Sequence, residues 1–572
     1  MTKSNLSRRD FLKGAGVTGM AGALALGGAS AAFADEPAAA GEAAPENPYS
    51  GVLGEDASLL PMRKADCPGP HGPVAFEGRT IADDEVVATE DTEVLIIGAG
   101  IGGIMASLKA AEEGAQVLMI EKMTEGHSAW ESFGATQATF QKEQGIEIDD
   151  AQLIDEILRA SDWRADPEVI TSYVKHSGEV ADFWQAMFDK TGTGWQIYKF
   201  DQAPNFNGFP VIDSYVNFKM PEGISKTWLF GLHVCEDLLK AGSMYPNWEV
   251  RYSTPAVQLV KGGGDRVTGA IAKTAEGYTR INASKGVLLA TGGYDANPEM
   301  MQAWVRPEDY QYSSWWNPSW GTTGDGHMMG LAVGAEMDSL PQPVMNFSNA
   351  TPSTFVEKRV YFPGAMNWGI MVTEEGKRFT NENNPRQYAG NAMNLQIRRG
   401  HTCFCIFDEA MIASALEKGG EAAAAQLDRD EAKGHLFRAG SIAEVASKAG
   451  IDGAALEATI NEYNQLFADN VERDPEYYRY TGNNQPFTGG TYYALLTCNV
   501  ILATVGGLAI NGNAQVLDTA GAPIEGLYAT GNASGSFYAG NYPRHIPGTS
   551  VGRAATFGYV AADHMVNGGS NA

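Results

Sequence analysis

Three glycines near residue 100 have a spacing that could bind the pyrophosphate of a dinucleotide. Gly98, Gly100 and Gly103 form a Gly-x-Gly-x-x-Gly pattern directly after the apolar run Val94 to Ile97. Such glycines permit a tight turn, let the backbone approach the pyrophosphate, and let the following helix pack closely on a strand. Glu121 ends a second apolar run and is placed to accept hydrogen bonds from ribose hydroxyls. The pattern predicts a dinucleotide site; an ordinary glycine-rich turn is the alternative.

Two arginines could bind a carboxylate substrate in a chain that is otherwise acidic. The formal net charge is −28 and the pI is near 4.7, which argues against a nucleic-acid partner. An anionic substrate would need arginines focused in one pocket. Arg386 follows the segment Arg378 to Glu382, and Arg544 precedes Gly548. From the residues alone both are carboxylate clamps, because guanidinium binds carboxylate in bidentate geometry; a surface ion pair is the alternative for Arg386.

Alternating strands and helices must position the glycine loop. Val94 to Ile97 and Val117 to Ile120 have the composition of buried strands. Between them Met105, Leu108 and Ala111 keep helical spacing, and Gly114 ends the helix. This strand, helix, strand order predicts an α/β fold with structure beginning at Glu93.

Similar motifs recur far along the chain. Lys285 to Gly293 is a strand that ends in Ala-Thr-Gly-Gly, and Gly526 to Asn532 returns near the C-terminus. Between about 340 and 499 short strands and amphipathic helices predominate. Their features are a Ser441-x-x-Glu444 capping box and a helical face of Leu456, Ile460, Tyr463 and Phe467. We expect a Rossmann-like dinucleotide domain, split in sequence, with an inserted α+β capping domain. The expected divisions are a signal at 1–34, a linker at 35–89, dinucleotide-domain parts at 90–339 and 500–572, and the capping domain at 340–499.

The N-terminal residues have the pattern of a twin-arginine export signal. Arg8 and Arg9 are followed by a weakly apolar run rich in Gly and Ala, and then by Ala32-Phe33-Ala34, a small-residue cleavage site. A transmembrane anchor is the alternative, but the run is too short for one. We expect export to the periplasm or cell surface and no membrane helix in the mature chain.

The cysteines and histidines predict neither a disulfide framework nor a metal site. Five cysteines are scattered along the chain, none in a Cys-x-x-Cys-His haem motif, and the nine histidines form no metal-binding pair. Cys403 and Cys405 are expected on a buried strand.

With these motifs in this order, the chain from about Glu93 resembles the soluble fumarate reductase and 3-ketosteroid dehydrogenase superfamily of FAD enzymes. The resemblance implies a two-dinucleotide-binding-type FAD domain. In it Asn532 holds the ribityl chain, and Ser550 and Val551 place backbone amides against the isoalloxazine ring. The helix that follows would stabilise the anionic reduced flavin. The implied cofactor residues are Gly98, Gly100, Gly103, Glu121, Lys122, Ser128, Gly134, Gly292, Asp325, Asn532, Ser550 and Val551.

The two branches of the superfamily differ at the proton-transfer residue. In the fumarate reductase branch an arginine that acts as general acid follows Arg-Phe-x-Asn-Glu, and Arg386 matches it; the steroid branch has a tyrosine there. Arg544, with Gly548, matches the substrate-binding arginine, although aligning it needs a one-residue gap. The resemblance implies hydride transfer from flavin N5 to the β-carbon of an α,β-unsaturated acid, with the proton from Arg386 and the developing charge stabilised by arginine.

The sequence departs from fumarate reductases at the far end of the substrate. Leu502-Ala503-Thr504 replaces one histidine-containing segment, and Pro341 to Asn349 contains no histidine. Approximately Phe362 and Ala365 replace the residues that reprotonate the arginine. These losses favour an aryl-acrylate-like monocarboxylate over fumarate. Tryptophans that could line its pocket, or pack the core instead, are Trp315, Trp316, Trp320 and Trp368.

Several alternatives stay open at this point. The activity could be that of a fumarate reductase or a steroid-type dehydrogenase, and a flavin electron shuttle without organic substrate is the non-enzymatic alternative. FAD is expected to be noncovalent, as in soluble relatives, with a covalent link at His127 as the alternative. Because the chain has no haem motif, a separate membrane-linked cytochrome or flavoprotein is expected to supply electrons.

Overall fold

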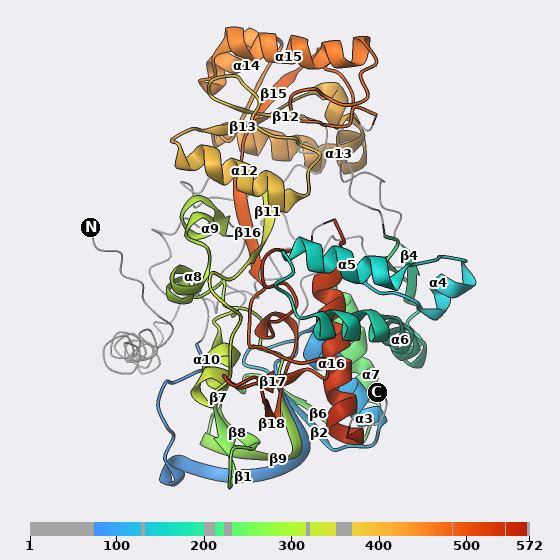
Figure 1. Ribbon diagram of the computed structural model, residues 1–572, viewed down its shortest axis with the longest axis vertical. Helices are drawn as coiled ribbons and strands as arrows, with labels where there is room; N and C mark the ends of the chain where they lie inside the picture. Colours follow the sequence, from blue (N-terminus) through green and yellow to red (C-terminus); the bar gives the residue numbers. More distant parts are fainter. Residues whose placement is uncertain are drawn as a thin grey trace.

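The computed structural model describes residues 74–126, 132–199, 212–221, 231–315, 321–350, 369–482, 484–543 and 545–568. Figure 1 shows two bodies along the long axis of the molecule, the lower built on a large sheet and the upper on a smaller one. The fold is therefore mixed α/β, as the sequence predicts.

The large sheet contains the predicted strand, helix, strand unit. β1 (Val86–Ile97) pairs in parallel with β2 (Val117–Ile120), with Val94 opposite Val117, and with β9 (Gly277–Leu289) on its other side. α3 (Ile101–Glu112) connects β1 to β2, and Gly114 follows it with φ +87°. The order β17-β18-β9-β1-β2-β6 is completed by β6 (Trp248–Arg251), β17 (Gln515–Leu517) and β18 (Pro523–Ala529), with β7 (Ala256–Lys261) and β8 (Val267–Thr274) joined to β9.

β1 begins earlier than the sequence predicts, at Val86 and not at Glu93. Its first half pairs only with β9, and most of its side chains there are at least partly exposed. An exposed half-strand lacks the apolar run by which buried strands are recognised, so this extension has no signal in the sequence.

Helices cover the large sheet, and one of them comes from the end of the chain. α16 (Thr549–Asn567) packs against α3 so closely that a Cβ on Gly558 would lie 2.1 Å from the Gly102 oxygen. Beside it lies α6 (Pro167–Thr191) (Figure 1). α16 also packs on β3 (Ser132–Gly134), which forms a small sheet with β5 (Tyr215–Lys219) and β4 (Gln196–Lys199). The other helices of this body are α4 (Thr139–Glu143), α5 (Asp150–Ala160), α7 (Gly231–Gly242), α8 (Pro298–Trp304), α9 (Pro307–Tyr312) and α10 (Asp325–Ala332).

The upper body has its own apolar core around an antiparallel sheet. The sheet order is β12 (Ile370–Thr373), β13 (Cys403–Asp408), β15 (Tyr492–Leu496) and β14 (Leu436–Ala439). Its helices are α12 (Arg386–Arg398), α13 (Glu409–Ala432), α14 (Ile442–Ala449) and α15 (Gly453–Ala468). Cys403 and Cys405 lie on a buried strand, as predicted. Ser441 caps α14 by accepting from the Glu444 amide, which is one half of the predicted capping box; the Glu444 side chain pairs with Lys448.

Two antiparallel strands join the bodies, β11 (Val344–Ala350) and β16 (Cys498–Thr504), with β10 (Ser314–Trp315) beside β16 (Figure 1). α12 of the upper body packs on both β11 and β16. In the part of the chain that the structure describes, no helix is long and apolar enough to cross a membrane. Within the same residues, no group of three His, Cys, Asp or Glu side chains could hold a metal ion.

Candidate flavin site

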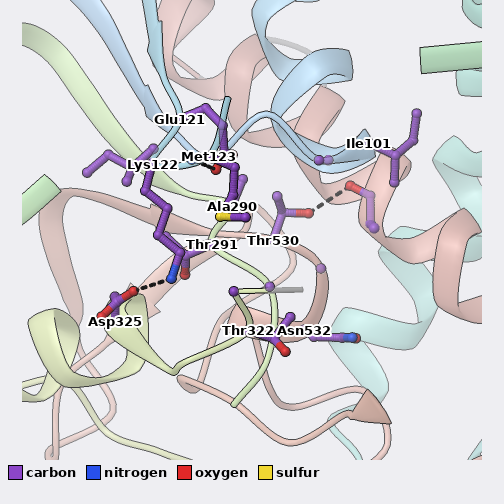
Figure 2. A pocket seen from close by; sticks show the side chains of 18 of the residues that line it. Ile101, Glu121, Lys122, Met123, Ala290, Thr291, Thr322, Asp325, Thr530 and Asn532 are labelled. Carbon is purple, nitrogen blue, oxygen red and sulfur yellow. Dashed lines mark hydrogen bonds and ion pairs between the residues drawn. The ribbon is translucent and has the colours of Figure 1, made fainter. Parts of the chain in front are cut away.

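A cavity of about 210 Å³, open to solvent, lies at the carboxyl ends of β1, β2 and β9. Figure 2 shows side chains from distant segments converging on it. Nine of the residues predicted to bind the cofactor line it: Gly98, Gly100, Glu121, Lys122, Gly292, Asp325, Asn532, Ser550 and Val551. The structure therefore brings together motifs that are more than four hundred positions apart in the sequence.

The glycine loop is tight enough to exclude side chains. Gly98 has φ +110°, and a Cβ there would lie 2.3 Å from the Ala290 oxygen. A Cβ on Gly103 would lie 1.9 Å from the Gly98 oxygen, so this glycine packs the helix against the loop and does not line the cavity. Gly100 is the N-cap of α3 and has no side chain to cap it. The first amides of α3 are thus free to bind the phosphates of a ligand.

Glu121 is held rigidly at the end of β2. One carboxylate oxygen accepts from the Ala99 amide at 2.8 Å and the other from the Met123 amide at 2.9 Å, and the side chain is buried. Each oxygen has a second lone pair, so the carboxylate can still accept from ribose hydroxyls. This position fits the adenosine end of a dinucleotide.

An ion pair that the sequence did not predict lies at the same end. Lys122 Nζ is 2.7 Å from Asp325 Oδ2 and also donates to Thr323 Oγ1 at 2.7 Å (Figure 2). Asp325 Oδ1 accepts from the amides of Ala75 and Phe76 at 2.8 and 3.0 Å. Both Lys122 and Asp325 were predicted to bind cofactor, but their contact with each other has no signal in the sequence.

Several polar atoms of the cavity wall have no protein partner. Asp295 Oδ1, Thr291 Oγ1 and Thr322 Oγ1 are buried and make no hydrogen bond of good geometry within the described residues, although Thr322 lies near enough to the Asp295 carboxyl group to act on its pKa. Burial raises the pKa of Asp295 to about 7. Buried polar atoms are normally satisfied, so these three favour a ligand with hydroxyl and phosphate groups, such as FAD. Sequence reasoning missed all three.

The opposite end of the cavity is partly apolar. Met345 from β11 and Leu502 and Ala503 from β16 line it, and Ser550 and Val551 line it from the first turn of α16. A dinucleotide whose adenosine lies at Glu121 and whose pyrophosphate lies at α3 would extend its flavin to this end. Asn532 lines the wall between the two ends, beside Thr322 in Figure 2.

Gly134 and Gly548 contact each other and do not line the cavity. The Gly134 amide donates to the Gly548 oxygen at 2.8 Å. Gly548 is the N-cap of α16 with φ +83°, and a Cβ there would meet Phe133 backbone at 2.4 Å. The contact between these two glycines fixes the start of α16 against β3. Cofactor binding by Gly134 and substrate binding by Gly548 stay predictions.

Arg386 begins α12 and does not line the cavity. The segment before it is anchored by buried charges: Glu382 accepts from Arg378 at 2.7 Å and from Arg479 at 3.1 Å. Burial acts to raise the pKa of Glu382, but both guanidinium groups outweigh it and hold that pKa below its usual range. The motif therefore positions the N-terminus of α12, which packs on the two strands that supply Met345, Leu502 and Ala503.

Several predicted positions lie outside the described residues. They are His127, Ser128, Trp316, Trp320, Phe362, Ala365, Trp368 and Arg544, and for Trp315 only the backbone is described.

Comparison with known proteins identifies the cofactor. Residues 93–550 match the family described as FAD binding domain, which is most of the chain. The chain belongs to this FAD-binding family. Residues 5–25 match the twin-arginine translocation signal, so the protein is exported by the twin-arginine route.

Relatives of this FAD protein place it in the fumarate reductase and 3-ketosteroid dehydrogenase superfamily. A urocanate reductase of Eggerthella lenta is 31% identical over 481 residues, 83% of this chain and 74% of that protein. The open conformation of a flavocytochrome c3 fumarate reductase has a TM-score of 0.63 and 25% identity, covering 84% of this chain and 79% of that one. The 3-ketosteroid Δ1-dehydrogenase of Sterolibacterium denitrificans shares the fold, with a TM-score of 0.67, 20% identity and coverage of 84% and 100%.

Proposed function

We propose that this exported FAD oxidoreductase reduces the carbon–carbon double bond of an α,β-unsaturated carboxylic acid with an aryl-like tail. The main support for this proposal is the apolar wall at the flavin end of the cavity, which is lined by Met345, Leu502 and Ala503. An apolar wall favours an aromatic tail over a second carboxylate. The similarity to a urocanate reductase supports the same substrate class.

Arg386 and Arg544 would carry the substrate chemistry. FAD, when bound, supplies the hydride. Arg544 would bind the substrate carboxylate in bidentate fashion, and Arg386 would deliver a proton to the α-carbon. The packing of α12 on β11 and β16 supports this role, because it directs the start of the helix toward the strands that border the flavin end. A closed, electropositive site is needed, since guanidinium is a poor acid.

We also propose that the upper body is a capping domain inserted into a split flavin domain. In support, β18 pairs in parallel with β9 although the whole upper body separates them in sequence. The upper body has a separate apolar core, and β11 and β16 are the strands that connect it to the flavin site. Closure of such a cap would exclude water from the reacting atoms.

A substrate panel tests the proposal. Holoprotein is reduced anaerobically with dithionite, and flavin absorbance is followed as fumarate, urocanate, a cinnamate or a 3-ketosteroid is added. We expect reoxidation at least tenfold faster with the aryl-acrylates than with fumarate. Saturated analogues of the same acids serve as controls and should not reoxidise the flavin. Reoxidation by none of the acids would favour an electron shuttle and contradict the proposal.

Arg386 has a matched control on its own helix. Arg386→Ala should slow reoxidation by the best acid at least a hundredfold, whereas Arg399→Ala, at the exposed end of α12, should not change it. Near wild-type turnover of Arg386→Ala would show that another group delivers the proton. The physiological electron donor is proposed to be a separate membrane-linked cytochrome or flavoprotein, since the sequence contains no haem-attachment motif.

A further inference from the structure

Arg553 is a fully buried arginine that the motifs did not single out. It lies in the second turn of α16, and its side chain is 0% exposed. Its Nη1 donates to the Ser534 carbonyl at 3.1 Å, and its Nη2 donates to Asn532 Oδ1 at 3.0 Å. Within the described residues Arg553 forms no ion pair within 4 Å, and the acidic residue that acts on its charge is Asp338.

A buried cation without an anionic partner is costly, and the surroundings of Arg553 reduce that cost only in part. Its guanidinium carbon lies 4.5 Å from the centre of the Tyr538 ring, a cation–π contact. Its Nε has no hydrogen-bond partner. The carboxylate of Asp338 attracts the guanidinium and offsets part of the burial, but it makes no ion pair within 4 Å and accepts from the Ser536 amide at 2.7 Å. Burial accordingly lowers the pKa of Arg553 from its usual value. Structures retain such charges mainly where a function uses them.

The position of Arg553 relative to the cavity indicates which function its buried charge could serve. Asn532 lines the cavity, and its amide oxygen is turned to Arg553. The amide nitrogen of Asn532, which has two protons to donate, is thereby turned away from Arg553. Ser550 and Val551 of the same helix line the flavin end of the cavity, and Ala554 lines it near the start of α3. Arg553 therefore stands directly behind the wall against which the flavin half of FAD would lie.

We propose that Arg553 is a positioning residue for the flavin. It fixes the Asn532 amide so that this amide donates to the cofactor, and its buried charge stabilises the reduced flavin as an anion. Two-electron reduction with uptake of one proton leaves one negative charge on the flavin, and this charge is the missing partner of the guanidinium. In a buried site with low dielectric constant the attraction is stronger than in water. The inference requires FAD binding but not a particular substrate.

The midpoint potential of the bound flavin tests whether the positive charge of Arg553 stabilises the reduced flavin. Arg553→Met holoprotein, reduced in the presence of a reference dye, should have a lower potential, because the anion loses its partner. We expect a change of about tenfold in the reduction equilibrium constant, which is ~30 mV for a two-electron couple. Arg553→Lys retains the charge and should change that constant less than threefold. Arg280→Met removes a partly exposed positive charge on β9, which pairs with Asp83, and should leave the potential unchanged. An unchanged potential in Arg553→Met, or an equal loss in Arg553→Lys, would overturn the electrostatic role.

FAD affinity tests the positioning role separately from redox chemistry. Arg553→Lys cannot make both contacts of the guanidinium fork, so apoprotein carrying it should bind FAD roughly tenfold more weakly in a fluorescence titration. Asn532→Ala should weaken binding at least as much. If Arg553 acts through Asn532, the double variant binds no more weakly than Asn532→Ala alone. Additive losses would show that Arg553 does not act through that amide.

The wild-type protein provides a test that does not depend on the folding of a variant. If the reduced flavin stays anionic, its reduction equilibrium constant changes tenfold per pH unit between pH 5 and 6.5, that is ~30 mV for two electrons and one proton. Free flavin takes up a second proton in this range. A hundredfold change per pH unit in the holoprotein would mean a neutral reduced flavin and would overturn the proposal.

Discussion

Lys122 Nζ and Asp325 Oδ2 lie 2.7 Å apart at the adenosine end of the cavity, and both side chains are mostly buried. The other oxygen of Asp325 accepts the amides of Ala75 and Phe76. One carboxylate thus joins the end of β2, the start of α10 and the segment before β1. We therefore expect the Lys122–Asp325 pair to stabilise the protein around the binding site as well as to contact the cofactor.

Breaking this pair should destabilise the protein and weaken FAD binding together. Removing one partner of a buried ion pair leaves an uncompensated charge and typically costs about 3 kcal/mol or more. We expect Lys122→Met to lower the free energy of unfolding by about that amount, measured by urea titration of the apoprotein. Asp325→Asn should cost less because an amide oxygen can still accept from Ala75. In a double-mutant cycle the two losses should be non-additive; additivity would mean that the pair is not coupled.

Gly103→Ala should abolish FAD binding because the added Cβ would lie 1.9 Å from the Gly98 oxygen, and backbone cannot move aside easily. The matched control is Gly263→Ala, where a Cβ meets nothing within 4 Å. Flavin content of the purified proteins, read from absorbance, gives the result. Normal flavin content in Gly103→Ala would show that α3 can shift without loss of the site.

The buried ion pairs around Glu382 should contribute to the thermal stability of the upper body. Glu382 is buried between Arg378 and Arg479, so Glu382→Gln removes the carboxylate that both guanidinium groups share and should cost roughly 3–5 kcal/mol, although Arg378 keeps its ion pair with Asp474. Thermal unfolding followed by circular dichroism measures the loss. Arg438→Met, which removes partly exposed ion pairs with Asp428 and Glu431, should change stability by less than about 1 kcal/mol. Equal losses in both variants would contradict a special role for Glu382.

Local patterns predicted local structure well. The glycine loop, α3, β2 and the acid at Glu121 follow from spacing along a short segment, and the structure has them where expected. Contacts between distant segments have no such signal. The partnership of Lys122 with Asp325, the orphan carboxylate oxygen of Asp295 and the contact of Arg553 with Asn532 depend on how separate elements pack. Sequence periodicity reports which face is buried but not what it is buried against.

Asp295 should make the stability of the apoprotein depend on pH. Its pKa is raised from 3.8 to about 7 by burial, so between these values the folded protein keeps a proton that the unfolded chain loses. The contribution of Asp295 to the free energy of unfolding is therefore fully present below about pH 4. It falls as the pH rises and is lost above about pH 7. The shift corresponds to roughly 4 kcal/mol.

Asp295→Asn removes that titration. The amide introduced by this substitution cannot ionise, so the variant should gain stability relative to wild type as the pH rises from 4 to 7, measured by urea unfolding of apoprotein at each pH. Asp265→Asn, at a fully exposed aspartate, is the control and should show no such trend. FAD that donates a hydrogen bond to the ionised Asp295 would reduce the difference in holoprotein, because the carboxylate would then gain a donor in addition to Thr322 and the backbone. A pH-independent difference between Asp295→Asn and wild type would show that this carboxyl group keeps an ordinary pKa.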